Sequence, residues 1–244
     1  MVSMSPMPAG AHGAREPTGG RAAGSLRDPL VRVLLVMTFT TGVVDAVSYL
    51  GLGRVFTANM TGNIVLLGFG IAGSGALPVV APLVSLCAFL TGSAAGGLLA
   101  ARGGDRHGRP FARALGIEVV LILAAVIVAA AVDVRPNAFS GDAVIVLLAL
   151  AMGVRNAAVR RLGVPDLTTT VLTMTLTGLA ADSRLAGGSG QGSARRVAAV
   201  LAMFGGAVAG ALLLEIGLVA PLLAAAALAL LVTIAYVPIA RRRS

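Results

Sequence analysis

Two short polar stretches carry side chains that could bind a solute. Each holds three amide or hydroxyl residues spaced two apart: Asn59, Thr61 and Asn63 in the first, and Thr173, Thr175 and Thr177 in the second. Amides and hydroxyls both donate and accept hydrogen bonds. Because the rest of the chain is mostly Ala, Val, Leu and Gly, the matched stretches are the strongest candidates for a site that binds a small polar molecule.

The spacing of these residues has two interpretations. An extended segment places alternate residues on one side, which suits a polar stripe in a re-entrant turn. A helix spreads them over about 200°, and Asn59 or Thr57 could then cap the helix that follows, while Thr hydroxyls bond carbonyls of their own helix. For any single residue, capping is the commoner role. A helix amino terminus at Thr61 and Gly62 would also favour an anion or a carbonyl oxygen.

Three further residues extend the candidate set: Asp45, Arg155 and Asn156. Asp45 lies about two thirds of the way along an apolar run, where a carboxylate costs a few kcal/mol unless it is paired or hydrated. The leading hypothesis is that Asp45 and Arg155 approach each other. The alternative places Asp45 at the membrane interface and lets Arg155 reach toward the surface. As the only deep carboxylate expected, Asp45 is also the candidate proton site.

The composition indicates an integral membrane protein. Of 244 residues, 57% are hydrophobic and 12% are charged, whereas soluble domains carry about 25% charge. The formal charge of +9 could indicate nucleic-acid binding. The Arg residues, however, cluster between apolar segments and at the chain ends, where they set membrane topology, so no nucleic-acid partner is expected.

Six apolar runs are long enough to span a bilayer: approximately 30–52, 78–101, 111–133, 141–160, 196–216 and 218–238. The polar stretches lie within two shorter segments, 56–73 and 166–183. If both shorter segments return to the side they entered from, the Arg-rich loops and both termini lie in the cytoplasm, as the positive-inside rule requires. Ordinary short, tilted helices are the alternative for both segments.

The chain also contains an internal similarity that predicts an inverted duplication. The two halves, 30–133 and 139–240, each have three crossings and one short segment, and residues 1–28 read as a disordered cytoplasmic tail. An odd number of crossings inverts one half relative to the other. The matching residues are 42–46 with 153–157, Thr61 and Gly62 with Thr177 and Gly178, and Gly92 and Gly96 with Gly206 and Gly210.

These motifs also resemble a known family. The patterns GVVDA at 42–46, FTANMTGN at 56–63, RNA at 155–157 and VPDLTTT at 164–170 are similar to those of the YoaK-like bacterial membrane proteins. The resemblance covers about residues 30–238 and implies a multi-pass protein of the bacterial inner membrane. It supplies no substrate.

The sequence therefore predicts an all-α helical bundle with six spanning helices and two short or re-entrant segments. The expected function is a channel or secondary transporter for a small polar or anionic solute; the alternative is a non-transporting structural or regulatory membrane protein. No nucleophile and base stand at catalytic spacing, so no enzymatic activity is expected. One cysteine and two histidines favour neither a metal nor a cofactor. The expected partners are the lipid bilayer and the solute, and no oligomeric state is predicted.

Overall fold

The structure is a computed structural model that describes residues 26–102, 108–162 and 172–243. Part of the expected tail, residues 1–25, lies outside the described residues, as does the beginning of the second polar stretch, 166–171. The described chain is helical, in the order α1 (Pro29–Ala46), α2 (Met60–Ile71), α3 (Val80–Ala101), α4 (Gly108–Ala131), α5 (Phe139–Leu162), α6 (Leu172–Ala181), α7 (Ser193–Leu214) and α8 (Val219–Arg243).

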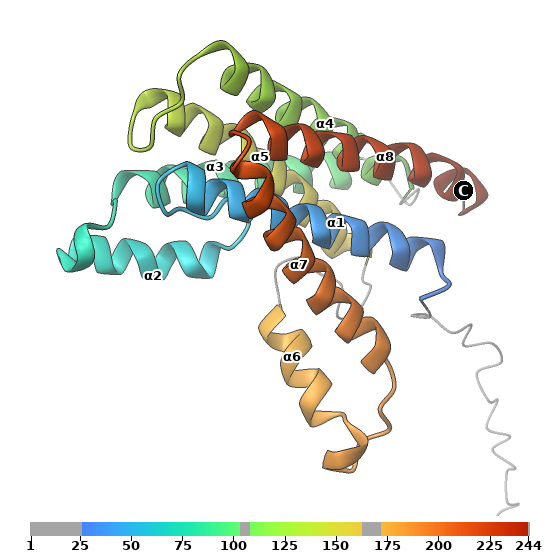
Figure 1. Cartoon of the computed structure of the whole chain (residues 1–244). Helices are drawn as coiled ribbons and strands as arrows, with labels where there is room; N and C mark the ends of the chain where they lie inside the picture. Colours follow the sequence, from blue (N-terminus) through green and yellow to red (C-terminus); the bar gives the residue numbers. More distant parts are fainter. Residues whose placement is uncertain (1–25, 103–107, 163–171, 244) are drawn as a thin grey trace, which may run out of the picture.

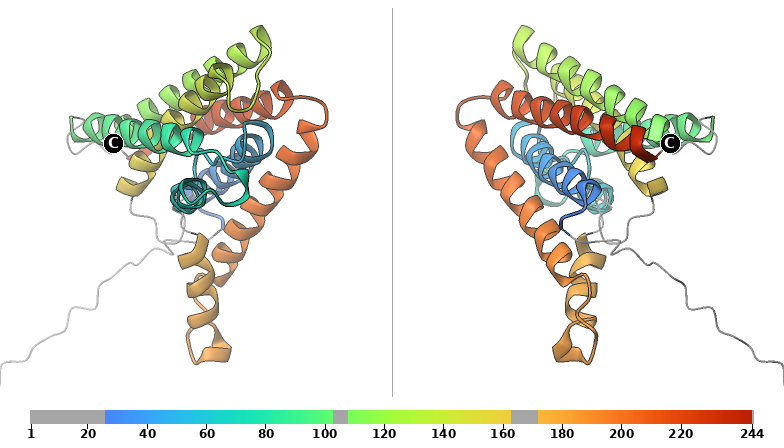
Figure 2. Two further views of the ribbon diagram at one scale, coloured as in Figure 1. Left: turned by 90° about the vertical axis from the view of Figure 1, so that its left-hand side faces the viewer. Right: turned by 90° about the vertical axis from the view of Figure 1, so that its right-hand side faces the viewer.

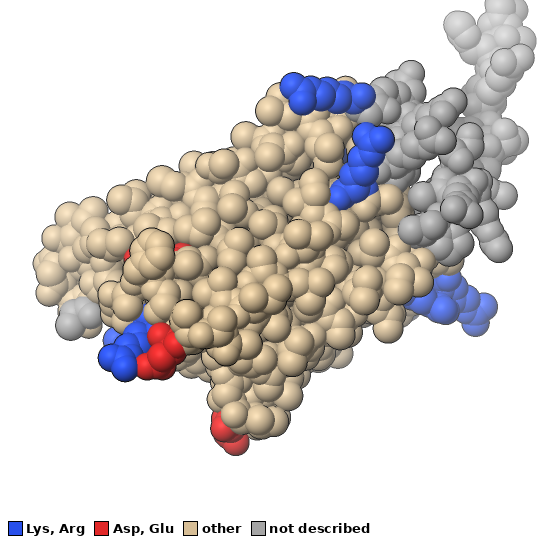
Figure 3. All heavy atoms as spheres, turned by 90° about the horizontal axis from the view of Figure 1, so that it is seen from above, with Lys and Arg blue, Asp and Glu red and all other residues tan. Residues whose placement is uncertain are grey.

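Six of these helices are long and apolar enough to cross a membrane: α1 with the π-helical turn Val47–Gly51 that continues it, α3, α4, α5, α7 and α8. This confirms the predicted all-α bundle with six spanning helices. In Figure 3 most of the visible cationic side chains lie toward one end of the body, a mixed group lies toward the other end, and a wide uncharged surface separates them. Such a surface suits contact with lipid acyl chains, where an exposed charge would be costly.

Four helices, α1, α4, α5 and α8, form the centre of the bundle. Helix α8 packs against α1 and α4, and α4 packs against α5. The four helices therefore form a row in the order α1, α8, α4 and α5. One more helix covers each end of this row, because α7 packs against α1 and α3 packs against α5. Figure 1 shows α7 crossing α1 at a steep angle, and Figure 2 shows α1 enclosed among its neighbours.

A polar layer divides the interior of this bundle. One apolar cluster includes Val44, Ile122 and Met152, and a second includes Met37, Leu115 and Ala158. Thr41, Glu118 and Arg155 lie in sequence between the members of the two clusters on α1, α4 and α5, and all three side chains are buried. A buried polar layer of this kind is costly unless its groups bond one another, and these residues do so.

Glycines allow two pairs of helices to cross in close contact. A Cβ added at Gly42 on α1 would collide with the backbone of Met203 and Ala207 on α7. A Cβ at Gly153 on α5 would collide in the same way with Phe89 and Ser93 on α3. The glycine pairs Gly92 and Gly96, and Gly206 and Gly210, face these crossings from α3 and α7. The two glycine pairs that match in the sequence thus have the same role, which is to allow close backbone contact between helices.

The two short helices are described over fewer residues than a spanning helix needs. At 12 and 10 residues, α2 and α6 reach about 18 and 15 Å, against a hydrocarbon core of about 30 Å. Each forms a hairpin with the helix that follows, α2 with α3 and α6 with α7. In the second hairpin, Nη1 of Arg196 on α7 donates to the carbonyl of Gly178 at 2.6 Å, and its Nη2 binds Asp182 at 2.8 Å.

Candidate functional site

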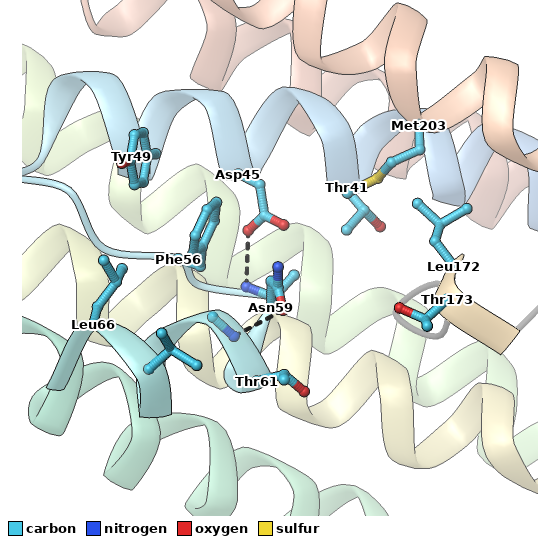
Figure 4. A pocket seen from close by; sticks show the side chains of 13 residues that line it. Thr41, Asp45, Tyr49, Phe56, Asn59, Thr61, Leu66, Leu172, Thr173 and Met203 are labelled. Carbon is cyan, nitrogen blue, oxygen red and sulfur yellow. Dashed lines mark hydrogen bonds between the residues drawn. The ribbon is translucent and has the colours of Figure 1, made fainter. Parts of the chain in front are cut away.

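A cavity of about 470 Å³ lies where the two short helices approach α1. Four of the predicted site residues line it: Asp45 from α1, Asn59 and Thr61 from the start of α2, and Thr173 from the start of α6. Thr41, Tyr49 and Phe56 complete its polar and aromatic wall, and the rings of Tyr49 and Phe56 stack with centroids 4.9 Å apart. Figure 4 shows Asp45, Asn59 and Thr173 facing this space.

The stretch TANMTGN is helical from Met60 onward, so the extended interpretation is wrong. Oδ1 of Asn59 accepts a hydrogen bond from the backbone N–H of Gly62 at 3.1 Å, which caps α2. The second stretch is also helical, and the hydroxyl of Thr177 donates to the carbonyl of Thr173 at 2.9 Å. A helix turns its residues in different directions, so Asn59 and Thr61 face the cavity while Asn63 does not.

Asp45 binds the segment that enters the cavity wall. Helix α1 passes into a π-helical turn after Ala46, the residue that follows Asp45, a feature frequent at functional sites. The chain then returns, and Oδ1 of Asp45 accepts a hydrogen bond from the backbone N–H of Ala58 at 3.0 Å. Because Thr57 and Ala58 are buried, non-helical backbone here requires such partners. Asp45 is itself only 6% exposed, so its carboxylate is buried within the protein.

Asn63 holds the same returning segment from the other side. Its Oδ1 accepts from the backbone N–H of Phe56 at 2.8 Å, and its Nδ2 donates to the carbonyl of Phe56 at 2.6 Å and to Oγ of Ser85 at 3.2 Å. Ser85 on α3 also donates to the Phe56 carbonyl. Asn63 is fully buried and does not line the cavity. Its position indicates a structural role.

We expect Asn63→Leu to lower the free energy of unfolding by about 1–3 kcal/mol, since both backbone groups of Phe56 would lose their partner. Asn63→Asp keeps the acceptor but replaces the donor with a buried carboxylate oxygen, so at least an equal loss is expected. Unfolding in sodium dodecyl sulfate measures both, with Thr61→Val as the control that leaves these bonds intact. An Asn63→Leu variant as stable as the wild type would contradict the structural role.

Arg155 forms its ion pair with Glu118, and not with Asp45, which it was predicted to approach. Nη1 of Arg155 lies 2.9 Å from Oε1 of Glu118, and both side chains are almost completely buried. Nη2 of Arg155 donates to the hydroxyl of Thr41. Arg155 is close enough to Asp45 for electrostatic attraction, but it is not the direct partner, and it does not extend to the surface.

The expectation that Asp45 is the only deep carboxylate is also wrong. Glu118 is 1% exposed and lies well inside α4, in the apolar run 111–133. The sequence already indicated a buried partner for Glu118, because a lone carboxylate in a spanning run needs one, as Asp45 does. Thr41 could have been found from the cluster of hydroxyl residues in α1, Thr38, Thr40 and Thr41.

Three remaining predicted residues lie away from the cavity wall. Asn156 follows Arg155 on α5, and its Nδ2 donates to the carbonyl of Met152 at 2.9 Å. Thr175 is buried, and Thr177 is exposed and bonded within its own helix. None of the three is among the residues that line the cavity. Of the three predicted threonines in the second polar stretch, Thr173 is therefore the one that lines the cavity.

The six apolar helices and the enclosed polar residues define a multi-pass α-helical membrane protein. A family described as "Protein of unknown function (DUF1275)" matches residues 33–235, and the chain belongs to this family. The chain is 34% identical over 151 residues to the UPF0700 transmembrane protein YoaK of Bacillus subtilis (strain 168), which covers 62% of the chain and 65% of that relative. This confirms the YoaK-like resemblance. No solved structure matches the chain.

Proposed function

We propose that the protein is a channel or secondary transporter for a small polar or anionic solute, which binds in the cavity between α1, α2 and α6. The observation that carries the proposal is the composition of the wall. Asp45, Asn59, Thr61 and Thr173 come from three helices that are separate in sequence and line one space. Its volume of about 470 Å³ falls in the range of small-molecule sites, about 300–1,000 Å³.

The ends of the two short helices support a solute path. Transporters often place the amino termini of interrupted helices near the membrane midplane, where free N–H groups face the solute. Here the first residues of α2 line the same cavity as Leu172 and Thr173 from the described part of α6. Non-helical backbone before α2 is buried in protein, the condition under which such backbone is tolerated in a membrane.

We also propose that the two halves are an inverted repeat, which the helix crossings support. The two crossings use equivalent residues. On α1, the residues that contact α7 are Gly42, Val43 and Ala46, and on α5 the residues that contact α3 are Gly153, Val154 and Ala157. The carbonyl oxygens of Val43 and Val154 each lie 2.9 Å from a Cβ added at Gly210 and at Gly96, respectively. Thr61 and Thr173 line the same cavity. The sequence comparison matched Thr61 with Thr177 instead, which lies one turn further along α6.

Solute flux into proteoliposomes tests the function. Stopped-flow light scattering with glycerol, acetamide and lactate gives the probes, with protein-free liposomes as the baseline. We expect Thr61→Val and Thr173→Val each to reduce the permeability for the transported probe about tenfold, because a lost hydrogen bond of about 1.4 kcal/mol corresponds to that factor. Thr177→Val, on the same helix but away from the cavity, should retain the wild-type rate. No flux above baseline for any probe would favour the non-transporting alternative.

For the orientation, we propose a plasma-membrane protein with both termini in the cytoplasm, since the Arg-rich loops require it under the positive-inside rule. Ser74 and Ser189 lie at the exposed tips of the two hairpins. In a Cys87→Ala background, an impermeant thiol reagent added to intact cells is expected to label Ser74→Cys and not Ser189→Cys. Labelling of Ser189→Cys alone would invert the orientation, and equal labelling of both would contradict the inverted repeat.

Two other functions are weaker. A structural or regulatory subunit would use the same polar residues only to hold helices together, and the roles of Asn63 and Ser85 fit that description. Thr61 and Thr173 do not, because they line a cavity. We propose no enzymatic activity, since the wall of the cavity offers a single carboxylate and no adjacent nucleophile and base.

A further inference from the structure

The cavity and the buried ion pair meet at one hydroxyl group. Thr41 lines the cavity, accepts a hydrogen bond from Nη2 of Arg155 and donates to the carbonyl of Met37. Arg155 binds Glu118 through Nη1. Asp45 follows Thr41 by one turn of α1, so the two residues share a face of that helix. Arg155 therefore lies between two buried carboxylates, Glu118 in the closed core and Asp45 in the cavity wall.

The bond between Arg155 and Glu118 leaves part of each group unused. Oε2 of Glu118 and Nε of Arg155 are buried and have no hydrogen-bond partner. A bidentate pair would use two parallel N–H···O bonds and hold the guanidinium in one orientation. With a single contact to the carboxylate at 2.9 Å, Arg155 can change partner by rotating its side chain without breaking a bidentate pair.

Asp45 has no direct counter-ion among the described residues. Oδ1 is occupied by the N–H of Ala58, and its second oxygen points toward the side of the cavity where Thr41 and Thr173 lie (Figure 4). An ionised carboxylate at this position is costly unless a proton, a cation or water compensates it. The second oxygen is therefore positioned to bind a proton, a cation or water from the cavity.

We propose that Asp45 is a proton-binding site that faces the solute, and that Arg155 is its alternative counter-ion. The inference rests on the proposed function, in which the cavity holds the solute. When Asp45 carries the proton, the cavity wall is neutral and Arg155 remains with Glu118. When the O–H bond breaks and the proton passes to water in the cavity, Arg155 is shared between the two carboxylates.

The surroundings favour a proton over an alkali cation. A hard metal cation requires several oxygen ligands, whereas the hydroxyl of Thr41 already donates to Met37 and accepts from Arg155. The guanidinium beside this hydroxyl would also repel a cation. A neutral Asp45, in contrast, removes the charge that would repel an anion at the amino terminus of α2. The solute class that follows is a small polar or anionic molecule that binds together with a proton.

Labelling with N,N′-dicyclohexylcarbodiimide tests the inference in the purified, lipid-reconstituted protein. The reagent adds to a protonated carboxyl group, and the acylisourea rearranges to a stable acylurea that mass spectrometry locates. In the wild type we expect modification at Asp45, more in acidic than in alkaline buffer, and none at Glu118. In Glu118→Gln, Arg155 has only Asp45 as a partner, so labelling should fall to the level of Asp45→Asn. The double variant Glu118→Gln with Arg155→Gln should regain labelling.

Equal labelling of Asp45 in the wild type and in Glu118→Gln would overturn the role of Arg155. Weaker labelling in sodium than in choline buffer at one pH would assign the site to an alkali cation and overturn the proton. No labelling in the wild type, together with no infrared carboxyl band that Asp45→Asn removes, would overturn the site itself. None of these measurements requires transport. Labelling without solute flux would therefore sink the proposed function alone, and flux without labelling would sink this inference alone.

Discussion

Gly206→Ala is expected to lower the free energy of unfolding by about 1–3 kcal/mol or more, the effect of forcing extra volume into a closely packed contact. The added Cβ would collide with the backbone of Phe39 on α1, and backbone cannot move aside as a flexible side chain can. Unfolding in sodium dodecyl sulfate measures the change. By the proposed repeat, Gly92→Ala should cost a similar amount, because its Cβ would meet the backbone of Leu150.

Gly205→Ala provides the matched control on the same helix. Its Cβ would lie 3.5 Å from a ring carbon of Phe39, an ordinary contact. Alanine has a higher helix propensity than glycine by about 1 kcal/mol, so this variant should be as stable as the wild type or more stable. Equal losses at positions 205 and 206 would show that α1 and α7 do not cross as closely as described.

The second large effect is expected at the buried ion pair. Arg155→Gln should destabilise the protein by about 3–5 kcal/mol, because the carboxylate of Glu118 would remain buried without its counter-ion. Glu118→Gln should act in the same direction but cost less, because Asp45 is then the carboxylate left to the guanidinium, beside its bond to the hydroxyl of Thr41. The double variant should be clearly more stable than either single variant, since replacing both members of a buried pair is often close to neutral.

A double-mutant cycle on the free energy of unfolding makes the comparison. Arg135→Gln is the control, because Arg135 pairs with Asp133 at 2.7 Å at an exposed site, where an ion pair contributes at most about 1 kcal/mol. Additive effects of Glu118→Gln and Arg155→Gln would contradict a direct pair. A cost at Arg155 no larger than that at Arg135 would contradict its burial in the polar layer.

The spans were predictable because their signal is local. A run of about 20 apolar residues has few alternatives to a membrane helix, and all six runs became helices. The cap at Asn59 was predictable for the same reason, because the oxygen and the N–H it binds lie three residues apart. The interpretation of 57–63 as an extended stripe failed because a spacing of two alone does not distinguish strand from helix.

The partners of buried charges were less predictable. Arg155 had two carboxylates within reach along the bundle, and the choice between Asp45 and Glu118 depends on how α1, α4 and α5 pack. Periodicity does not contain that information. The same holds for Thr173 and Thr177, since the packing of α6 against α7 decides which hydroxyl faces the cavity. The cavity residues from α1 and α2 followed from local polarity, whereas the choice on α6 required the three-dimensional structure.

The enclosure of α1 sets the order in which the protein can assemble. It is the most enclosed of the six long helices, and its main neighbours are α7 and α8, which leave the ribosome long after it. Until they insert, the glycine face of α1 that receives α7 is open to lipid or to a chaperone. Closing contacts between distant parts of a chain is slow. The wall of the cavity beside Asp45 is thus completed only after α7, which supplies Met203, has inserted.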